Sequence, residues 1–388
     1  MIILFDLYNA QPIGTSKFHG GGEYIKTIFK NVVDKIGNSF DKNVEISVFF
    51  NKQKYLDDWI IEIIKYNDII VHNVVNKEDI QKLLLSQSYD VFYTGMPYMY
   101  DNIDLSNIKY KTCTIHGLRD IEKIYDKYSF FYLNNLQIAK IVIKILMKKI
   151  YVKKQKKKYS DLIEKFDCII TDSNHSKYAI LVRINYSYEY KIKMMFAPNK
   201  YLEIKNIQNS NYFKKYFLLI GGNRWEKNSY RAIRAFELLF SMGLLNEYKV
   251  IVVGNLPQKI VSKIKYNKYI FKDYVDTIEL ENLYYNCDVF VYPTLNEGFG
   301  MPPLEAMKYG KTCIVSCVCS LQEVCGDAVY YVNPYDIEEI ANRILKSTKE
   351  KIEKSKIFLQ YKKIYERQEN DLNLICKCIV EGEKNDTN

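Results

Sequence analysis

The residues from Asn286 to Glu305, NCDVFVYPTLNEGFGMPPLE, contain the pattern that decides the fold. Asp288 to Tyr292 is a short apolar run rich in β-branched and aromatic residues and closed by a proline, which is typical of a buried strand. A polar loop with two glycines, Gly298 and Gly300, follows. Two prolines then supply the fixed φ of a first helical turn, so the pattern predicts a short helix from Leu304 to Tyr309.

The order of strand, glycine loop and helix N-terminus suits an anionic ligand. Backbone N–H groups point outward at such a helix start, and the helix dipole favours negative charge there. Glu297 lies before the turn and Glu305 just inside the helix. A loop that accepts phosphate and also carries carboxylates can hold phosphate and sugar hydroxyls together. A simpler explanation of Glu305 stays open, because a first-turn carboxylate interacts favourably with the dipole without any ligand.

The run from about Phe271 to Asp336 resembles the E-x7-E segment of the retaining GT-B glycosyltransferases of family 4, also called glycosyl transferases group 1. The residues that carry the resemblance are Glu297, Gly298, Phe299, Gly300, Met301, Pro302, Leu304, Glu305, Ala306, Met307 and Gly310. The continuation that fits the same family is Ser316, Leu321, Glu323, Val324, Gly326, Asp327 and Ala328. The resemblance covers the C-terminal half of the chain well and the N-terminal half weakly.

Strand and helix patterns alternate along the chain, which predicts an α/β fold with parallel, doubly wound sheets. The predicted strands are 2–7, 44–50, 88–94, 111–115, 166–171, 194–198, 217–220, 249–253 and 312–318. A chain of 388 residues is long enough for two or three domains. The resemblance implies the GT-B arrangement of two Rossmann-like domains facing across a cleft. The expected parts are an N-terminal acceptor-side domain over 1–205, a C-terminal nucleotide-sugar-binding domain over 206–364, and a last helix over about 365–388 that packs back on the first domain.

The composition is ordinary for a globular protein, with 48% hydrophobic and 26% charged residues. The net charge of +10 favours an acidic partner such as a nucleotide, a lipid phosphate or an anionic membrane. A codon bias toward Lys, Asn, Ile and Tyr explains the same net charge, so the net charge alone does not identify a partner. We expect no nucleic-acid partner. The sequence shows no signal-peptide pattern and no run of about 18 uncharged apolar residues. The nine scattered cysteines indicate free thiols. The expected location is therefore the cytoplasm, with an additional peripheral position on the inner face of the membrane as one alternative.

A glycine triplet, Gly20, Gly21 and Gly22, stands between the first predicted strand and a helical pattern that begins at Glu23. Glycines let a backbone approach a ligand closely. The triplet is not the G-x-G-x-x-G of dinucleotide-binding folds. The resemblance implies that these glycines face the acceptor and the donor phosphate, and a flexible turn is the alternative.

His116 ends the predicted strand 111–115 and is one of only four histidines. In a doubly wound sheet the ligand lies beyond the carboxyl ends of the strands, so a histidine at such a position is a candidate functional group. The resemblance implies a histidine that reaches the donor sugar and is usually followed by Asp. Gly117 stands in that place here, so the match is partial, and Arg119 or Asp120 could take part instead.

The segment 137–158, QIAKIVIKILMKKIYVKKQKKK, alternates apolar residues with lysines and ends in a lysine-rich tail. A basic, apolar helix of this kind can lie on an anionic membrane surface. The other interpretation is a helix packed on the sheet with a solvated lysine end. The sequence leaves both open.

A second glycine loop follows the predicted strand 217–220 and carries Gly222, Arg224 and Lys227. Basic side chains before a helix N-terminus are suited to neutralising a diphosphate. The resemblance implies an Arg and a Lys in this loop, with the Arg nearer the position of Gly222, so Arg224 is a shifted candidate. A solvated basic loop is the alternative. Further on, Tyr274 and Val275 fall in a segment that resembles the one holding the nucleotide base.

The resemblance implies transfer of a sugar from a nucleoside diphosphate sugar to a hydroxyl of a saccharide or lipid-linked acceptor, with retention of configuration. Arg224, Lys227 and the loop amides near Gly300 would stabilise the leaving diphosphate, and Glu305 would accept from the ribose hydroxyls. Glu297 would lie near the sugar, where it would orient hydroxyls or stabilise positive charge. No Asp-x-Asp stands in a metal-binding context, so we expect neither a metal nor any other cofactor.

Two other classes of protein remain open from the sequence. One is a different GT-B enzyme, a sugar-nucleotide epimerase or a phosphorylase. The other is a catalytically silent GT-B subunit that binds a partner enzyme. The glutamates and Lys227 argue against a silent subunit, whereas the shifted Arg224 and the glycine after His116 leave it open.

Overall fold

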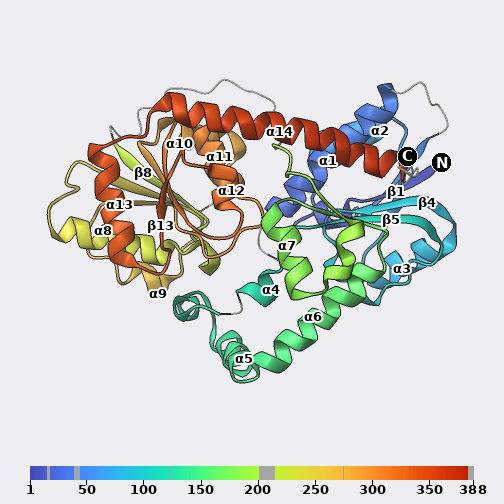
Figure 1. Cartoon of the computed structure of the whole chain (residues 1–388), viewed down its shortest axis with the longest axis horizontal. Helices are drawn as coiled ribbons and strands as arrows, with labels where there is room; N and C mark the ends of the chain where they lie inside the picture. Colours follow the sequence, from blue (N-terminus) through green and yellow to red (C-terminus); the bar gives the residue numbers. More distant parts are fainter. Residues whose placement is uncertain (15–17, 39–43, 124, 201–214, 274, 383–388) are drawn as a thin grey trace. The chain divides into compact units, whose positions relative to one another are not determined.

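The computed structural model describes the chain except for residues 15–17, 39–43, 124, 201–214, 274 and 383–388 (Figure 1). Its contacts divide the chain into two compact units. The first unit consists of Met1–Leu118, Lys153–Leu202 and Tyr365–Asn388, and the second of Arg119–Val152 and Glu203–Ile364. Arg119–Val152 therefore groups with the second unit, whereas the sequence analysis placed it in the N-terminal domain.

The first unit is built on a seven-stranded parallel sheet in the order β3-β2-β1-β4-β5-β6-β7. Its strands are β1 (Ile2–Asp6), β2 (Glu45–Phe50), β3 (Ile70–Asn73), β4 (Tyr89–Thr94), β5 (Ile108–Ile115), β6 (Cys168–Thr171) and β7 (Ile192–Met194). Its α-helices are α1 (Gly20–Asn38), α2 (Asp58–Tyr66), α3 (Lys77–Ser86), α7 (Asn174–Arg183) and most of α6 (Lys148–Glu164). The described residues of this unit also form the 3-10 helices η1 (Tyr8–Ala10), η2 (Pro97–Asn102) and η4 (Tyr186–Lys191).

The second unit is built on a six-stranded parallel sheet in the order β10-β9-β8-β11-β12-β13. Its strands are β8 (Tyr216–Ile220), β9 (Lys249–Val253), β10 (Tyr269–Lys272), β11 (Val289–Tyr292), β12 (Thr312–Ser316) and β13 (Tyr330–Val332). Its α-helices are α4 (Arg119–Glu122), α5 (Asn135–Leu146), α8 (Ser229–Ser241), α9 (Gln258–Val261), α10 (Thr277–Asn286), α11 (Met301–Met307), α12 (Leu321–Cys325) and α13 (Ile337–Lys349). Two 3-10 helices belong here, η3 (Lys127–Tyr132) and η5 (Trp225–Lys227).

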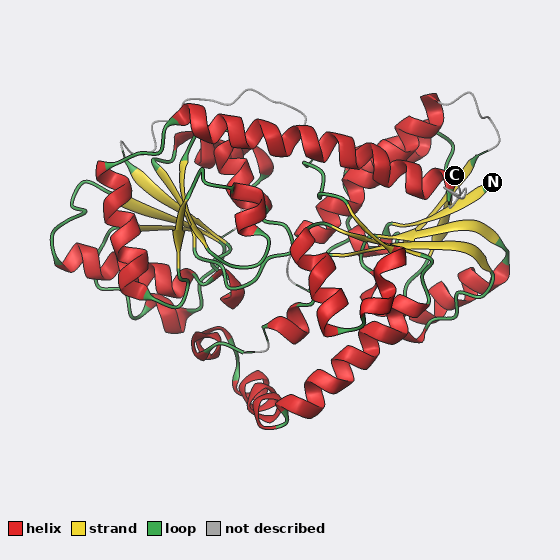
Figure 2. Cartoon of the chain, viewed as in Figure 1, coloured by secondary structure: helices red, strands yellow, loops and turns green. Residues whose placement is uncertain are grey.

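Helices lie on both faces of each sheet, which confirms the predicted doubly wound α/β class (Figure 2). The last helix, α14 (Lys354–Glu381), begins in the second unit and ends in the first. In the described part of the chain, no helix combines the length and the apolar character that crossing a membrane requires.

The strand order places two loops of the second unit side by side. β8 pairs with β9 on one side and with β11 on the other. Successive strands are therefore added in one direction from β8 to β10 and in the opposite direction from β11 to β13. Such a switch point leaves a crevice at the carboxyl ends of the two strands. The loop after β8 and the loop after β11 leave the sheet there, and both carry predicted site residues.

Several predicted elements differ from the observed ones. The helix predicted from Glu23 begins at Gly20, because the Nδ1 of His19 accepts a hydrogen bond from the Gly22 amide at 3.0 Å and caps the helix start. The glycine triplet is therefore the first turn of α1. The segment 137–158 is not one helix, since α5 ends before Met147 and α6 begins after it. The short edge strand β3 has no fully buried residue and was missed.

Smaller shifts affect element ends. α11 covers Met301–Met307, three residues earlier than predicted at its start, because Gly300 has a left-handed φ of 108° and starts the helix directly. The last strand of the first unit is Ile192–Met194, which overlaps the predicted 194–198 only at Met194. Most of the predicted linker, 199–213, lies outside the described residues.

A buried ion pair attaches the segment before α5 to the second unit. The two terminal nitrogens of Arg231 on α8 donate to the two carboxylate oxygens of Asp126 at 3.0 and 3.1 Å. Both side chains are almost fully buried, at 2% and 5% exposure. The Arg231 guanidinium also lies over the rings of Tyr128 and Tyr335, at 4.4 and 5.2 Å from their centroids. The pair therefore holds η3 against α8.

We predict that Arg231→Met destabilises the protein by about 3 kcal/mol, because it leaves the Asp126 carboxylate buried without its main partner. Urea unfolding followed by circular dichroism measures the change. Arg234→Met is the matched control, since Arg234 is exposed on the same helix, and it should change the free energy of unfolding by less than about 0.5 kcal/mol. Equal effects of the two variants would contradict the structural role of the pair.

Candidate active site

The loop after β8 runs very close to the loop after β9. Gly221 has a φ of +82°, and a Cβ added to Gly222 would lie 2.4 Å from the carbonyl oxygen of Gly254. The Gly221 and Gly222 amides both donate to the Val253 carbonyl at 2.9 Å. Glycine at these positions therefore allows the loop to turn tightly, and the turn directs the residues that follow toward the β11 loop.

Asn228 fixes the end of this loop. Its backbone is left-handed, with a φ of 61°, and its buried side-chain amide donates to the carbonyls of Pro293 at 2.8 Å and Pro334 at 2.7 Å. The side-chain carbonyl of Asn228 accepts from Arg231 at 2.9 Å. The loops after β8, β11 and β13 are thus joined by one side chain. Lys227, its neighbour, is held at the end of η5.

Lys227, Glu297 and Tyr292 form a buried cluster at the switch point. The Lys227 ammonium forms an ion pair with the Oε1 of Glu297, and it donates to the Tyr292 hydroxyl at 2.5 Å. Tyr292 in turn donates to the same Glu297 oxygen at 2.5 Å, and Thr294 donates to it at 3.2 Å. Only 11% of the lysine side chain and 10% of the glutamate side chain are exposed. The structure therefore brings together two of the residues that the sequence singled out.

Burial and mutual attraction set the protonation of this cluster. Burial is the main cause that lowers the pKa of Lys227 to about 8; the charge of Glu297 raises the pKa in part, and Arg224 lowers it again by a smaller amount. Burial alone would raise the pKa of Glu297, but Lys227 and the hydrogen bond from Tyr292 hold it below its usual range. Burial and the adjacent glutamate raise the pKa of the Tyr292 phenol. Near neutral pH the cluster thus contains an ammonium, a carboxylate and a neutral phenol.

Arg224 lies on the same loop and is half-exposed. Its Nε is 4.0 Å from a carboxylate oxygen of Glu226, and its amide donates to the Gly221 carbonyl at 3.0 Å. The Glu226 backbone carbonyl accepts from the Leu295 amide at 2.7 Å, which links the β8 loop to the β11 loop again. Arg224 is therefore positioned as a second cation beside Lys227.

The glycine loop after β11 has a left-handed residue and is closely packed. Gly300 has a φ of 108°, and a Cβ there would lie 2.5 Å from a methyl carbon of Leu321. The Ser320 hydroxyl donates to the carbonyl of Phe299 at 2.7 Å, and the Phe299 side chain is buried. These contacts fix the path of Gly298, Phe299 and Gly300 into the start of α11, where Met301 is the first helical residue.

Glu305 is oriented by a buried tyrosine. The hydroxyl of Tyr284 on α10 donates to the Oε2 of Glu305 at 2.7 Å. Burial, and then the charge of Glu305, raise the pKa of this phenol well above its usual value, so it remains a donor. This hydrogen bond helps to fix the direction of the Glu305 carboxylate on α11.

His116 is the predicted site residue of the first unit that has a titratable side chain. Both of its ring nitrogens lie within hydrogen-bond distance of an acceptor. Nδ1 lies 3.0 Å from the Asp172 carboxylate, and Nε2 lies 3.0 Å from the carbonyl oxygen of Gly95. The ring of Tyr24 packs edge-on against it, with centroids 4.8 Å apart. These partners fix the ring at the carboxyl end of β5, as the sequence predicted for its position.

The glycine triplet has a packing role in the structure. A Cβ on Gly21 would lie 2.5 Å from the sulfur of Met96, and one on Gly22 would lie 2.9 Å from the Ala10 carbonyl oxygen. Gly20 has open space around it. The first turn of α1 therefore lies directly against the loops after β1 and β4, at the switch point of the first sheet.

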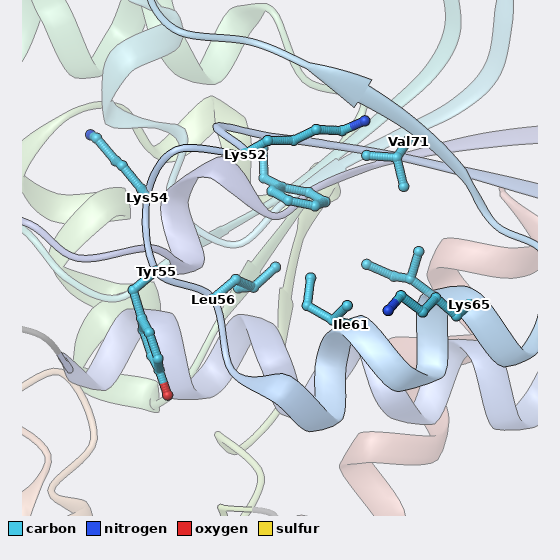
Figure 3. Close-up of a pocket in the computed structure, with 9 residues that line it drawn as sticks. Lys52, Lys54, Tyr55, Leu56, Ile61, Lys65 and Val71 are labelled. Atoms are coloured by element: carbon cyan, nitrogen blue, oxygen red, sulfur yellow. The ribbon is translucent and has the colours of Figure 1, made fainter.

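A separate hollow in the first unit has a volume of about 430 Å³ and lies between β2, α2 and β3. Figure 3 shows the apolar side chains of Leu56, Ile61 and Val71 converging on it. Lys52 and Lys65 also line the hollow. None of the residues predicted for the site contributes to it.

Sequence reasoning missed three side chains that hold the site together, Tyr292, Tyr284 and Asn228. Tyr292 could have been found, because it is the last residue of a predicted strand at the position where ligands bind. Tyr284 gives no such signal, since its contact with Glu305 depends on how α10 packs on α11. Of the predicted base-binding residues, Val275 is buried. Tyr274 lies outside the described residues.

Comparison with known proteins gives a family match in the C-terminal part of the chain. Residues 201–364 match the family model described as glycosyl transferases group 1. Over 76 residues, 19% of this chain and 9% of the relative, the chain is 43% identical to the serotype-specific mannosyltransferase WbdA of Escherichia coli. Over 237 residues, 59% of this chain and 58% of the relative, it is 28% identical to the O-antigen chain mannosyltransferase RfbU of Salmonella typhimurium. The alignments thus span less than two thirds of these relatives.

Solved structures show the same fold over nearly the whole chain. Sucrose-phosphate synthase from Thermosynechococcus elongatus aligns with a TM-score of 0.63 and 15% identity over 97% of this chain and 96% of that one. Anabaena Alr3699/HepE in complex with UDP and glucose aligns with a TM-score of 0.61 and 15% identity over 98% of both chains. The fold is therefore of the GT-B type, with two Rossmann-like domains.

We predict that Gly300→Ala destabilises the protein by about 1–3 kcal/mol, because it combines a left-handed φ with a Cβ that collides with Leu321. Urea unfolding provides the measurement. Gly37→Ala is the control, since no atom lies within 4 Å of its added Cβ and Gly37 lies within helix α1. This control should be neutral or stabilising by up to about 1 kcal/mol. A neutral Gly300→Ala would show that the loop does not need this conformation.

Proposed function

We propose that this protein is a glycosyltransferase that moves a sugar from a nucleoside diphosphate sugar to a hydroxyl of a saccharide or lipid-linked acceptor. The observation that carries the proposal is the buried cluster of Lys227, Glu297 and Tyr292 at the switch point of the second sheet. It lies within the segment that matches the glycosyl transferases group 1 model. The structural likeness to Alr3699/HepE, solved with UDP and with UDP-glucose, supports a nucleotide-sugar donor.

In the proposed reaction, the bond between the anomeric carbon and the diphosphate oxygen breaks, and the acceptor oxygen forms a new bond to that carbon. The acceptor proton passes to the departing diphosphate. Negative charge grows on the diphosphate, and Lys227 and Arg224 are the cations placed to stabilise it. We propose that these cations replace a metal ion and that the configuration at the anomeric carbon is retained.

The two glutamates have separate proposed roles. Glu305, oriented by Tyr284, accepts hydrogen bonds from the ribose hydroxyls of the nucleotide. Glu297 stays ionised, because Lys227 and Tyr292 lower its pKa, and it stabilises the positive charge that develops on the sugar. His116, in the first unit, is proposed to contact the donor sugar, with Asp172 fixing its ring.

The likeness to WbdA and RfbU favours mannose as the transferred sugar and a surface polysaccharide as the product. We therefore propose GDP-mannose as the first donor to test, followed by UDP-linked hexoses. Incubation with an acceptor extract and analysis of the anomeric proton by NMR would report both transfer and stereochemistry. Hydrolysis or epimerisation without an acceptor would instead indicate another GT-B enzyme.

A thermal-shift screen with GDP, UDP and ADP, with and without magnesium, tests the donor site. A ligand that binds only the folded protein raises the melting temperature. We expect one diphosphate to stabilise the wild type without magnesium, and we expect Glu305→Ala and Lys227→Ala to lose that shift. Arg234→Ala, on the exposed face of α8, is the control. No shift with any diphosphate would favour a catalytically silent subunit.

The pH dependence of diphosphate binding should report on Lys227. Its pKa of about 8 means that the free protein loses this ammonium as the pH rises above about 8, while the diphosphate stays fully ionised. The association constant of the selected diphosphate should thus be flat from pH 7 to about 7.5 and fall by up to about tenfold per unit above pH 8. Isothermal titration calorimetry measures it.

Lys227→Arg is the matched control for this pH profile. Because a guanidinium stays protonated, the variant should show no fall below pH 9.5. A wild-type profile that stays flat to pH 9.5 would contradict the assigned role of Lys227.

Glu297→Gln should separate catalysis from binding. The amide keeps the size of the side chain and an acceptor for Tyr292 but removes the negative charge, so we expect the turnover number to fall by about 100-fold or more. The same variant removes the charge that raises the pKa of Lys227, so diphosphate binding should weaken at a lower pH than in the wild type. Unchanged turnover would argue against a role for Glu297 in transfer.

A further inference from the structure

The segment that leads into α5 is firmly attached to the second unit. Asp126 pairs with the buried Arg231, and the side chains of Tyr128, Phe131 and Tyr132 pack against the core of that unit. A capping box then starts α5, because the Asn134 side chain accepts from the Gln137 amide while the Gln137 side chain accepts from the Asn134 amide. The start of α5 is therefore held by the ion pair and the aromatic packing before it and by the capping box at its first turn.

The helix α5 itself buries none of its side chains, although it is rich in isoleucine and leucine. Its most exposed apolar side chains are Leu136 at 75%, Ile143 at 56% and Leu146 at 80%, and Ile150, just after the break, is 63% exposed. At about 100° per residue Leu136, Ile143 and Leu146 lie on one face of α5, whereas Ile150 belongs to the first turn of α6. Ile138 and Ile141, which are half-buried, lie on the opposite face. An apolar face thus points to solvent.

Lysines precede, interrupt and follow this apolar face along the chain. From residue 127 to 160 the sequence contains no Asp or Glu but has ten lysines: Lys127, Lys140, Lys144, Lys148, Lys149, Lys153, Lys154, Lys156, Lys157 and Lys158. Lys148 and Lys149 at the start of α6 are exposed, as are Lys153 and Lys154 one turn later. Figure 1 shows α5 and α6 as successive helices of the chain. The segment thus combines exposed apolar side chains with charged side chains that are all positive.

We propose that α5 and the first turns of α6 form a docking surface for an anionic lipid membrane. An apolar helix face flanked by lysines is the pattern that lies in a membrane interface, with the apolar groups among the acyl chains and the ammonium groups at the lipid phosphates. A second copy of this chain is disfavoured as the occupant, because it would bring the same ten lysines to the contact. The surface goes beyond the proposed transfer reaction and does not depend on it.

Vesicle co-sedimentation of the full chain tests the proposal. We expect the partition coefficient to be at least tenfold higher for vesicles of phosphatidylcholine and phosphatidylglycerol in equal parts than for phosphatidylcholine alone at low salt, and to fall as salt screens the charges. Ile143→Glu and Leu146→Glu should each lower binding to the anionic vesicles at least tenfold. Replacing Lys148, Lys149, Lys153 and Lys154 together by Gln should do the same.

Leu359→Glu is the matched control, because Leu359 is 71% exposed on α14 and lies outside the proposed surface. It should bind vesicles as the wild type does. All three α5 and α6 variants change exposed residues, so their melting temperatures and their thermal shifts with the selected diphosphate should stay at wild-type values. This second readout separates a failure of docking from a failure of the donor site.

Three results would overturn the proposal. One is the absence of binding to the anionic vesicles. Another is unchanged binding by Leu146→Glu. The third is concentration-dependent dimerisation in light scattering that Leu146→Glu abolishes, which would assign the face to a second copy of the chain.

Discussion

The ion pair between Lys227 and Glu297 is the interaction on which the candidate site depends. Each charge is buried, and removing a charge from water is costly unless an opposite charge and hydrogen bonds replace the solvent. Tyr292 and Thr294 supply those hydrogen bonds to the carboxylate. The pair therefore holds the loop after β8 against the loop after β11. A polar cluster of this kind stays in place without ligand and presents a cation where a diphosphate would arrive.

Further hydrogen bonds connect the loop that carries Lys227 to other parts of the second unit. Asn228 joins the β8 loop to the backbone after β11 and β13, and it accepts from Arg231. Arg231 in turn binds Asp126 at the base of the segment that carries α5. Lys227 and the exposed helix are thus connected by a short series of buried hydrogen bonds. The helix α5, which carries the apolar part of the proposed docking surface, thus belongs to the same unit as the proposed donor site.

Much of the fold could be predicted from the sequence, because buried parallel strands are continuous apolar runs. Lys249–Val253 was predicted without error, and the strand, glycine loop and helix around Gly300 were found in the right order. The errors lie where the local pattern is ambiguous. The glycine triplet looked like a loop, and only the imidazole of His19 shows why a helix begins at Gly20. β3 is a short edge strand with little burial, so its apolar signal is weak.

The sequence by itself determined which chemical groups the site contains, since Arg224, Lys227, Glu297 and Glu305 lie in or beside glycine-containing loops that follow apolar strands. Tertiary structure decided which of them meet. Lys227 and Glu297 are seventy residues apart, and only the pairing of β8 with β11 brings them into contact. It also decided that α5 leaves its apolar face in solvent. Periodicity fixes which residues share a face, but what covers that face depends on long-range packing that no local pattern encodes.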